Sequence, residues 1–117
     1  MENIRWPSEW MRGVLAMCVL AAVAAQPDGT HGYAIGRRLA DGGLGRIKGG
    51  TLYPVLARLE ADGLVTSSWG AGEGGPGRKT FVITALGRDE LARRRQAWQE
   101  FVGVAAGLMD DQDRSST

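Results

Sequence analysis

A glycine-rich run near the middle of the chain constrains the fold most, because it contains the letters of a dinucleotide-binding fingerprint. The run SWGAGEGGPGRK occupies residues 68–79, and Gly70, Gly72 and Gly75 have the G-x-G-x-x-G spacing. That fingerprint holds a pyrophosphate only where the glycine turn leads directly into a helix within a βαβ unit. Here the run leads into TFVIT at residues 80–84, which has the pattern of a strand. The sequence therefore predicts no nucleotide cofactor and favours two strands joined by a glycine-rich loop.

Three short helices are predicted before this run. The first begins after Ser8, its expected N-cap, and continues to about Ala25, where proline and glycine mark a turn. The second spans residues 30–40 and ends at two glycines, which can take the left-handed cap conformation. The third spans residues 51–62 and ends at Gly63, and its apolar side chains recur on one face: Leu52, Val55, Leu56 and Leu59. Short helices joined by a glycine-containing link are typical of a helix-turn-helix.

A hairpin and one long helix complete the expected fold. The strands are expected at residues 64–69 and 80–84, and the helix runs from Ala85 to Met109 with Thr84 as its N-cap. Apolar side chains on this helix have a heptad-like spacing that is typical of packing against a partner: Leu91, Trp98, Phe101, Ala105 and Leu108. The predicted fold class is mainly α with a small β-hairpin: a winged helix-turn-helix domain over residues 8–84, a C-terminal dimerisation helix over 85–109 and a disordered tail over 110–117.

The charge of the chain is nearly balanced but unevenly distributed. The net charge of the 117 residues is only +1, so no overall field draws the protein to nucleic acid. Between Arg37 and Lys79 there are seven Lys or Arg against four acids, whereas the rest of the chain has seven against nine. This local excess is compatible with an anionic partner, although on charge alone an ordinary solvated surface is the simpler interpretation.

Cysteine and histidine usage excludes two kinds of site. With Cys18 as the single cysteine and His31 as the single histidine, neither an internal disulfide nor a zinc site is expected. Cys18 is expected to be a buried, unreactive thiol, and His31 to start a helix rather than to act as a ligand or a switch. The twelve apolar residues 14–25 fall short of the roughly 20 that span a bilayer, which predicts a core helix, no membrane partner and a cytoplasmic location.

Five short motifs resemble those of the PadR family of winged-helix transcriptional regulators, in its short members with a single C-terminal helix. They are HGYAI at residues 31–35, GTLYP at 50–54, LEADGLV at 59–65, RK at 78–79 and ITALG at 83–87. Each motif alone is weak, but all five occur in the order that the family has. The resemblance covers roughly residues 12–92.

The resemblance implies a homodimer in which the first and last helices of the two subunits interlock. Two recognition helices would then enter successive major grooves of a palindromic operator. The family acts mainly as repressors, and some members are released by small aromatic or cationic compounds. The residues support a dimer independently, since the first helix is apolar on every side and the last carries an apolar seam.

Contacts with double-stranded DNA are expected at the start of the third helix and at the base of the wing. A helix N-terminus suits a phosphate because of its free amides and positive dipole end. Tyr53 matches the family's DNA-facing tyrosine, with a half-buried core position as the alternative. Tyr33 could donate to a phosphate or pack against the third helix, and Arg58 could contact a phosphate or be solvated. The full candidate set is Tyr33, Lys48, Gly50, Thr51, Tyr53, Arg58, Arg78 and Lys79.

Aromatic side chains on the first and last helices are candidates for an effector site. In the family's short members, an aromatic on the last helix can face its symmetry mate and stack flat ligands. Trp98, Phe101 and Trp10 could line such a pocket or, more simply, form the dimer core. The run Arg93-Arg94-Arg95 places one arginine within the apolar seam and interrupts it.

The expected function is therefore sequence-specific regulation of transcription, as a repressor that binds DNA as a homodimer. The alternative is a winged-helix module that binds a ligand or a protein without reading DNA. The basic and polar residues at the third helix and the wing favour DNA. No nucleophile–base pair or carboxylate cluster is apparent in the sequence, so an enzyme is not expected.

Overall fold

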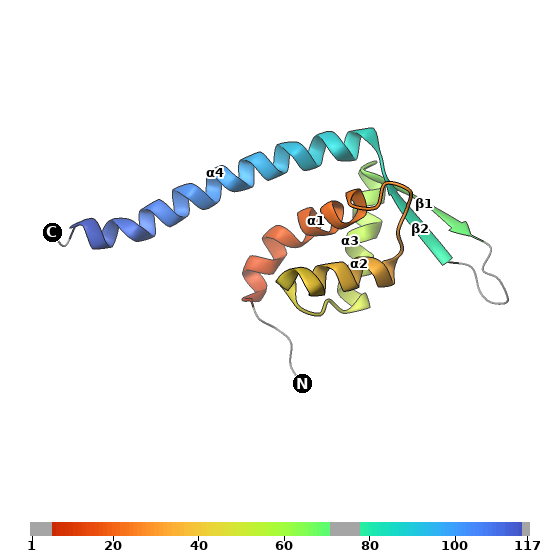
Figure 1. Cartoon of the computed structure of the whole chain (residues 1–117), viewed down its shortest axis with the longest axis horizontal. Helices are drawn as coiled ribbons and strands as arrows, with labels where there is room; N and C mark the ends of the chain where they lie inside the picture. The colour runs from red at the N-terminus through yellow and green to blue at the C-terminus, as the bar shows by residue number, and fades with distance from the viewer. Residues whose placement is uncertain (1–5, 71–77, 116–117) are drawn as a thin grey trace.

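The computed structural model describes the backbone of residues 6–70 and 78–115 and the side chains of residues 6–70 and 78–110 (Figure 1). In chain order the elements are α1 (Ser8–Ala24), α2 (Gly32–Leu39), the π-helical turn η1 (Ala40–Leu44), α3 (Gly49–Ala61), β1 (Val65–Gly70), β2 (Arg78–Ile83) and α4 (Ala85–Ser115). This order of helices and strands agrees with the mainly α fold that the sequence predicts. None of the described helices is both long enough and apolar enough to cross a membrane.

The core is built around α1. This helix packs against α2, α3, α4 and β2, and Val19, Leu20 and Val23 have no exposed surface. The structure thus confirms that the apolar run at residues 14–25 forms a buried core helix. The predicted apolar face of α3 also lies in the core, with Val55 half-buried and three leucines fully buried: Leu52, Leu56 and Leu59.

A backbone pair helps to join the hairpin to the helical part. β1 and β2 are antiparallel, with Val65 opposite Ile83, and Phe81 and Ile83 are buried on one face, as predicted. The loop between α1 and α2 adds Thr30 to the sheet, because its amide and carbonyl exchange hydrogen bonds with Phe81 at N···O distances of 3.0 and 2.7 Å. The wing base therefore lies beside the start of α2. The tip of the glycine-rich run, residues 71–77, lies outside the described residues.

Two helices begin at a different residue than the sequence predicts. Ser8 is the first residue of α1, and Pro7, with its extended backbone, occupies the cap position and accepts the first helical hydrogen bonds. α3 begins at Gly49 rather than at Thr51. Lys48 has the extended backbone of a cap, and its carbonyl already accepts the first amides of the helix, so the two glycines after it are helical.

The end of α2 agrees with the prediction, whereas the end of α4 does not. α2 ends at Leu39, and in the π-helical turn η1 that follows it Gly43 takes a left-handed φ of +111°, as expected of one of the two glycines. α4 continues past Met109 to Ser115. The tail at residues 110–117, expected to be disordered, is thus helical as far as Ser115, and these helical residues include neither glycine nor proline to break the helix. The last two residues of the chain lie outside the described part.

The junction between the hairpin and α4 has the predicted caps. Gly63 takes a φ of +78° after α3, which is the left-handed conformation expected of a C-terminal cap. The Thr84 hydroxyl accepts a 2.9 Å hydrogen bond from the Gly87 amide and donates one of 2.7 Å to the Gly63 carbonyl. Thr84 therefore caps α4 and joins it to the end of α3.

α4 extends beyond the rest of the molecule (Figure 1). The radius of gyration is 17.1 Å, against about 13 Å for a compact chain of this length. The C-terminal half of α4 exposes large apolar side chains to solvent: Phe101, Val102, Val104, Leu108 and Met109. An apolar surface of this kind on a projecting helix favours an intermolecular contact.

Candidate nucleic-acid interface

The first turn of α3 is exposed and offers unpaired amides. In the described part of the chain, no side chain caps this turn, and the amides of Gly49 and Gly50 have no hydrogen-bond acceptor. Lys48 and Thr51 flank these glycines and are exposed. Because a helix N-terminus carries a partial positive charge, the turn has the geometry of a phosphate site.

Tyr53 is held between two glycines. Its hydroxyl lies against Gly32 at the start of α2, where a β-carbon would have no room, and its ring lies 3.5 Å from the place of a β-carbon on Gly49. Even so, 51% of the residue is exposed. Tyr53 is thus both packed and half exposed, so the half-buried position and the DNA-facing position expected from the sequence are compatible.

A cleft between α2 and α3 gathers tyrosines and arginines. Its volume is about 540 Å³, and Tyr33, Arg37, Arg46 and Tyr53 are among the residues that line it. The exposed Tyr33 hydroxyl accepts a 3.4 Å hydrogen bond from Arg37. This hydrogen bond, with a smaller contribution from the charge of Asp41, raises the pKa of Arg37 above its ordinary value. Sequence reasoning missed Arg37 and Arg46, although Arg37 could have been found from its spacing of four residues from Tyr33 on one helix face.

The two basic residues at the wing base point to different elements. Arg78 places its guanidinium 3.1 Å from Nε2 of His31 at the start of α2. Lys79 places its ammonium 3.9 Å from the Glu60 carboxylate of α3 and 5.8 Å from the centroid of the Trp69 ring. Neighbouring residues in a strand face opposite ways. Although Arg78 and Lys79 are adjacent in sequence, Arg78 therefore contacts the start of α2, whereas Lys79 pairs with the C-terminal part of α3.

Arg58 lies apart from these residues. Its side chain is 80% exposed and forms an ion pair with Asp62 at 3.7 Å. It lines a different pocket, which it shares with Ala16 of α1 and Arg94 of α4. The structure thus brings together all of the predicted helix residues except Arg58. We call their exposed surface the α2–α3 face, which comprises Tyr33, Arg37, Arg46, Lys48, Gly49, Gly50, Thr51 and Tyr53.

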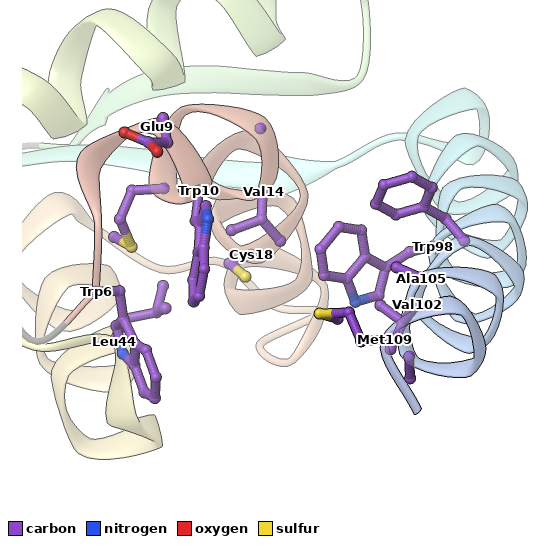
Figure 2. Close-up of a pocket in the computed structure, with 14 residues that line it drawn as sticks. Trp6, Glu9, Trp10, Val14, Cys18, Leu44, Trp98, Val102, Ala105 and Met109 are labelled. Carbon is purple, nitrogen blue, oxygen red and sulfur yellow. The ribbon is translucent and has the colours of Figure 1, made fainter. Parts of the chain in front are cut away.

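An apolar pocket of about 760 Å³ lies between α1 and α4 (Figure 2). Trp10 on α1 and Trp98 on α4 stand on opposite sides of it. Phe101 packs at an angle beside Trp98, with 6.0 Å between the ring centroids. The three aromatic residues singled out from the sequence therefore surround one pocket. Leu44 of η1 lines its other end, so the pocket reaches the turn that leads toward α3.

The pocket lining contains one acid and one thiol. Among the described residues that line it, Glu9 is the only charged one. Cys18 is half-buried there, and this burial raises the pKa of its thiol. A raised pKa keeps the thiol protonated at neutral pH, which agrees with the unreactive role expected from the sequence.

The arginine that interrupts the apolar seam of α4 is Arg94. It is half-buried, and its Nε donates to the Glu90 carboxylate at 2.6 Å. Arg93 pairs with the same carboxylate, and the Glu90 side chain is only 18% exposed. Because Arg94 pairs with the largely buried Glu90 carboxylate, which Arg93 also contacts, its charge is tolerated within the apolar seam.

Comparison with known proteins places this geometry in a family. The model of the transcriptional regulator PadR-like family matches residues 19–93. The chain is 33% identical over 99 residues to "Transcriptional regulator Rv3488" of Mycobacterium tuberculosis, covering 85% of this chain and 89% of that protein.

Solved structures show the same fold. A PadR family transcriptional regulator from Eggerthella lenta is 34% identical, with a TM-score of 0.78 over 88% of each chain. A PadR-like regulator from Bacillus cereus is 27% identical, with a TM-score of 0.74 over 86% of this chain and 96% of the other. These likenesses confirm the predicted fold class, a winged helix-turn-helix followed by one C-terminal helix.

Proposed function

The chain belongs to the PadR-like family of transcriptional regulators, and we propose that it binds a palindromic DNA operator as a homodimer and represses transcription. The observation that carries this proposal is the α2–α3 face, where free helix amides, partly exposed tyrosines and arginines lie on one surface. The direct test is selection of bound duplexes from a random DNA pool at fixed salt. An enriched palindrome would support the proposal, and a pool without enrichment would overturn it.

The alternative is a winged-helix module that binds a ligand or a protein without reading DNA. Such a module has no need of free cations on the α2–α3 face. Arg37, Arg46 and Lys48 are exposed there, and in the described part of the chain none of them makes an ion pair with a carboxylate. Unpaired cations beside free helix amides favour a polyanion, so we favour DNA.

We infer that α3 enters the major groove by its N-terminal turn. Lys48, Gly50 and Thr51 would then lie closest to the base edges and to the nearest phosphate. Tyr33 and Tyr53 would contact the flanking backbone, and Arg58, further along α3, would reach no more than an outer phosphate. In a two-fold dimer the second α3 would lie about one helical turn away, roughly 34 Å along the duplex.

Arg78→Ala should flatten the salt dependence of DNA binding more than Lys79→Ala does. Lys79 already shares its charge with Glu60, whereas among the described residues Arg78 contacts the His31 imidazole and pairs with no carboxylate. Each phosphate contact contributes about 0.9 to the slope of log K against log salt. Loss of Arg78 from both subunits should therefore reduce the slope by about 2, and loss of Lys79 by less. Fluorescence anisotropy of a labelled duplex across a salt series measures both slopes, at about pH 5.5 so that no neutral imidazole holds the Arg78 guanidinium, and an unchanged slope in Arg78→Ala would count against a phosphate contact.

We further propose that the pocket between α1 and α4 takes a flat aromatic cation as effector. The Trp10 and Trp98 rings offer stacking faces, and Glu9 supplies a negative charge in an otherwise uncharged lining. In the proposed dimer, a partner subunit would complete the open side of this pocket. A ligand there would also contact Leu44 of η1, directly before the segment that leads into α3.

Measurements with a cationic and a neutral ligand should separate the contributions of Trp98 and Glu9 to binding affinity. We expect ethidium, a flat cation, to change the tryptophan fluorescence of the wild type, and Trp98→Phe to remove most of that change. Glu9→Gln should weaken ethidium binding about threefold, the worth of a partly exposed charge pair, and leave the affinity for a neutral flavone unchanged. No fluorescence response to either compound would argue against an effector pocket.

A further inference from the structure

His31 lies where the start of α2 meets the base of the wing. Its Nδ1 lies 3.4 Å from the amide of Ala34, in the position of a helix cap. Its Nε2 lies 3.1 Å from the guanidinium of Arg78, 47 residues along the chain. The backbone pair between Thr30 and Phe81 holds the two segments side by side at this point. An N–H group therefore lies beside each of the two ring nitrogens.

The two contacts of His31 compete with each other. Both partners are N–H donors, whereas a neutral imidazole has only one nitrogen free to accept, because the other carries a proton. The bond from Arg78 is shorter and is assisted by charge, so it prevails over the bond from Ala34. On this argument the neutral ring would carry its proton on Nδ1 and accept from Arg78 at Nε2, at the expense of the bond from Ala34.

We propose that His31 is a proton-dependent positioning residue for the wing. The neutral ring holds the Arg78 guanidinium against the start of α2. The protonated ring has no acceptor nitrogen and puts a second positive charge next to that guanidinium, so it releases Arg78. The freed guanidinium and the imidazolium then both reach the DNA backbone, and binding tightens as the pH falls. This inference rests on the proposed DNA binding.

The surroundings of His31 do not compensate a positive ring. Arg38 of α2 and Gln26 of the preceding loop share a small pocket with it, to which α1 contributes an alanine. The Tyr53 hydroxyl of α3 lies at the glycine that follows His31. Asp28 of the same loop is exposed, and among the described residues no carboxylate forms an ion pair with His31. Among the described residues no carboxylate is thus paired with the ring, and in a complex a DNA phosphate would be available to neutralise its positive charge.

The test is the pH dependence of DNA binding in the wild type and in His31→Asn. Asparagine is a good helix cap and does not titrate, and its side chain is too short to hold Arg78 as the imidazole Nε2 does. The probe is a labelled random-sequence duplex of about 30 base pairs, since phosphate contacts do not depend on sequence. Between about pH 8 and about pH 5.5, the wild type should gain about tenfold in affinity, about threefold per subunit.

In the same series, the wild-type salt slope should become steeper at the lower pH, and His31→Asn should show neither change. Equal pH dependence in the two proteins would overturn the inference, as would a wild type whose affinity is flat across the range. Absence of binding at every pH would instead reject the proposed function. The titration thus separates the two failures.

A readout without DNA tests the contact itself. The chain has a single histidine, so its ring nitrogens can be observed by ¹⁵N NMR without further assignment. At about pH 8 the neutral ring of the wild type should be protonated mainly on Nδ1, and Arg78→Ala should shift the proton to Nε2, so that Nδ1 caps α2. The same proton position in both proteins would contradict the inference whatever the DNA measurements give.

Discussion

Gly87→Ala should lower the melting temperature by about 10 °C or more. A β-carbon on Gly87 would collide with the Leu64 carbonyl oxygen and would lie 2.8 Å from the Ile83 side chain. The Leu64 carbonyl cannot move away, because it accepts a 3.0 Å hydrogen bond from the Thr84 amide. Forcing an atom into such a site costs about 3 kcal/mol or more, and each kcal/mol shifts the melting temperature of a domain this size by about 4 °C. Thermal unfolding followed by circular dichroism measures the change.

The matched control for Gly87→Ala is Gly107→Ala in the same helix. Gly107 has no atom within 4 Å of its β-carbon position, so alanine should be neutral or stabilise the helix by up to about 1 kcal/mol. If the two variants melted at the same temperature, the close contact at Gly87 would carry no energetic weight. If the melting temperature fell in both variants, the destabilisation would come from replacing a glycine in α4 and not from the contact of Gly87 with Leu64.

The elements whose local sequence and tertiary environment agree could be predicted well. The leucines of α3 recur at helical spacing and are buried as a set, and Gly63 takes the left-handed cap that its position after the helix requires. Thr84 caps α4 as predicted, because its hydroxyl accepts a hydrogen bond from the Gly87 amide. The hairpin was predictable because a strand follows the glycine-rich run, with Phe81 and Ile83 alternating inward.

The start of α3 was not predictable, because tertiary structure overrides local preference there. Two glycines are poor helix formers, yet Gly49 and Gly50 are helical, and Gly49 lies against the ring of Tyr53. The π-helical turn η1 has no sequence signal, and Leu44 within it faces the pocket.

The candidate site was predictable as a set of residues but not as a geometry. Arg78 and Lys79 are adjacent in sequence and were assigned one role, but one lies against His31 and the other against Glu60. Contacts that span 47 residues depend on how the wing docks, which a single sequence does not encode locally. Arg37 and Arg46 were missed because their importance comes from the cleft that α2 and α3 form together.

Phe101→Glu should convert the proposed dimer into a monomer at micromolar concentration. Phe101 lies on the apolar face of α4 beside Trp98 and is 62% exposed in the single chain. In a dimer that face would be covered, and an unpaired carboxylate there would be costly to bury. Sedimentation velocity measures the change in mass, and circular dichroism shows whether the helix content is retained, as expected for a residue outside the core.

Loss of the dimer should also weaken DNA binding by at least about 100-fold, because two linked half-sites gain a factor of about 10² to 10⁴ over one. Gln96→Glu is the matched control: it adds the same charge to an exposed residue of α4, on the side of the helix away from Trp98, so mass and affinity should stay close to wild type. A Phe101→Glu protein that remained dimeric and bound DNA normally would place the interface elsewhere. A monomer with wild-type affinity would contradict the palindromic operator instead, since a single wing and α3 would then suffice for binding.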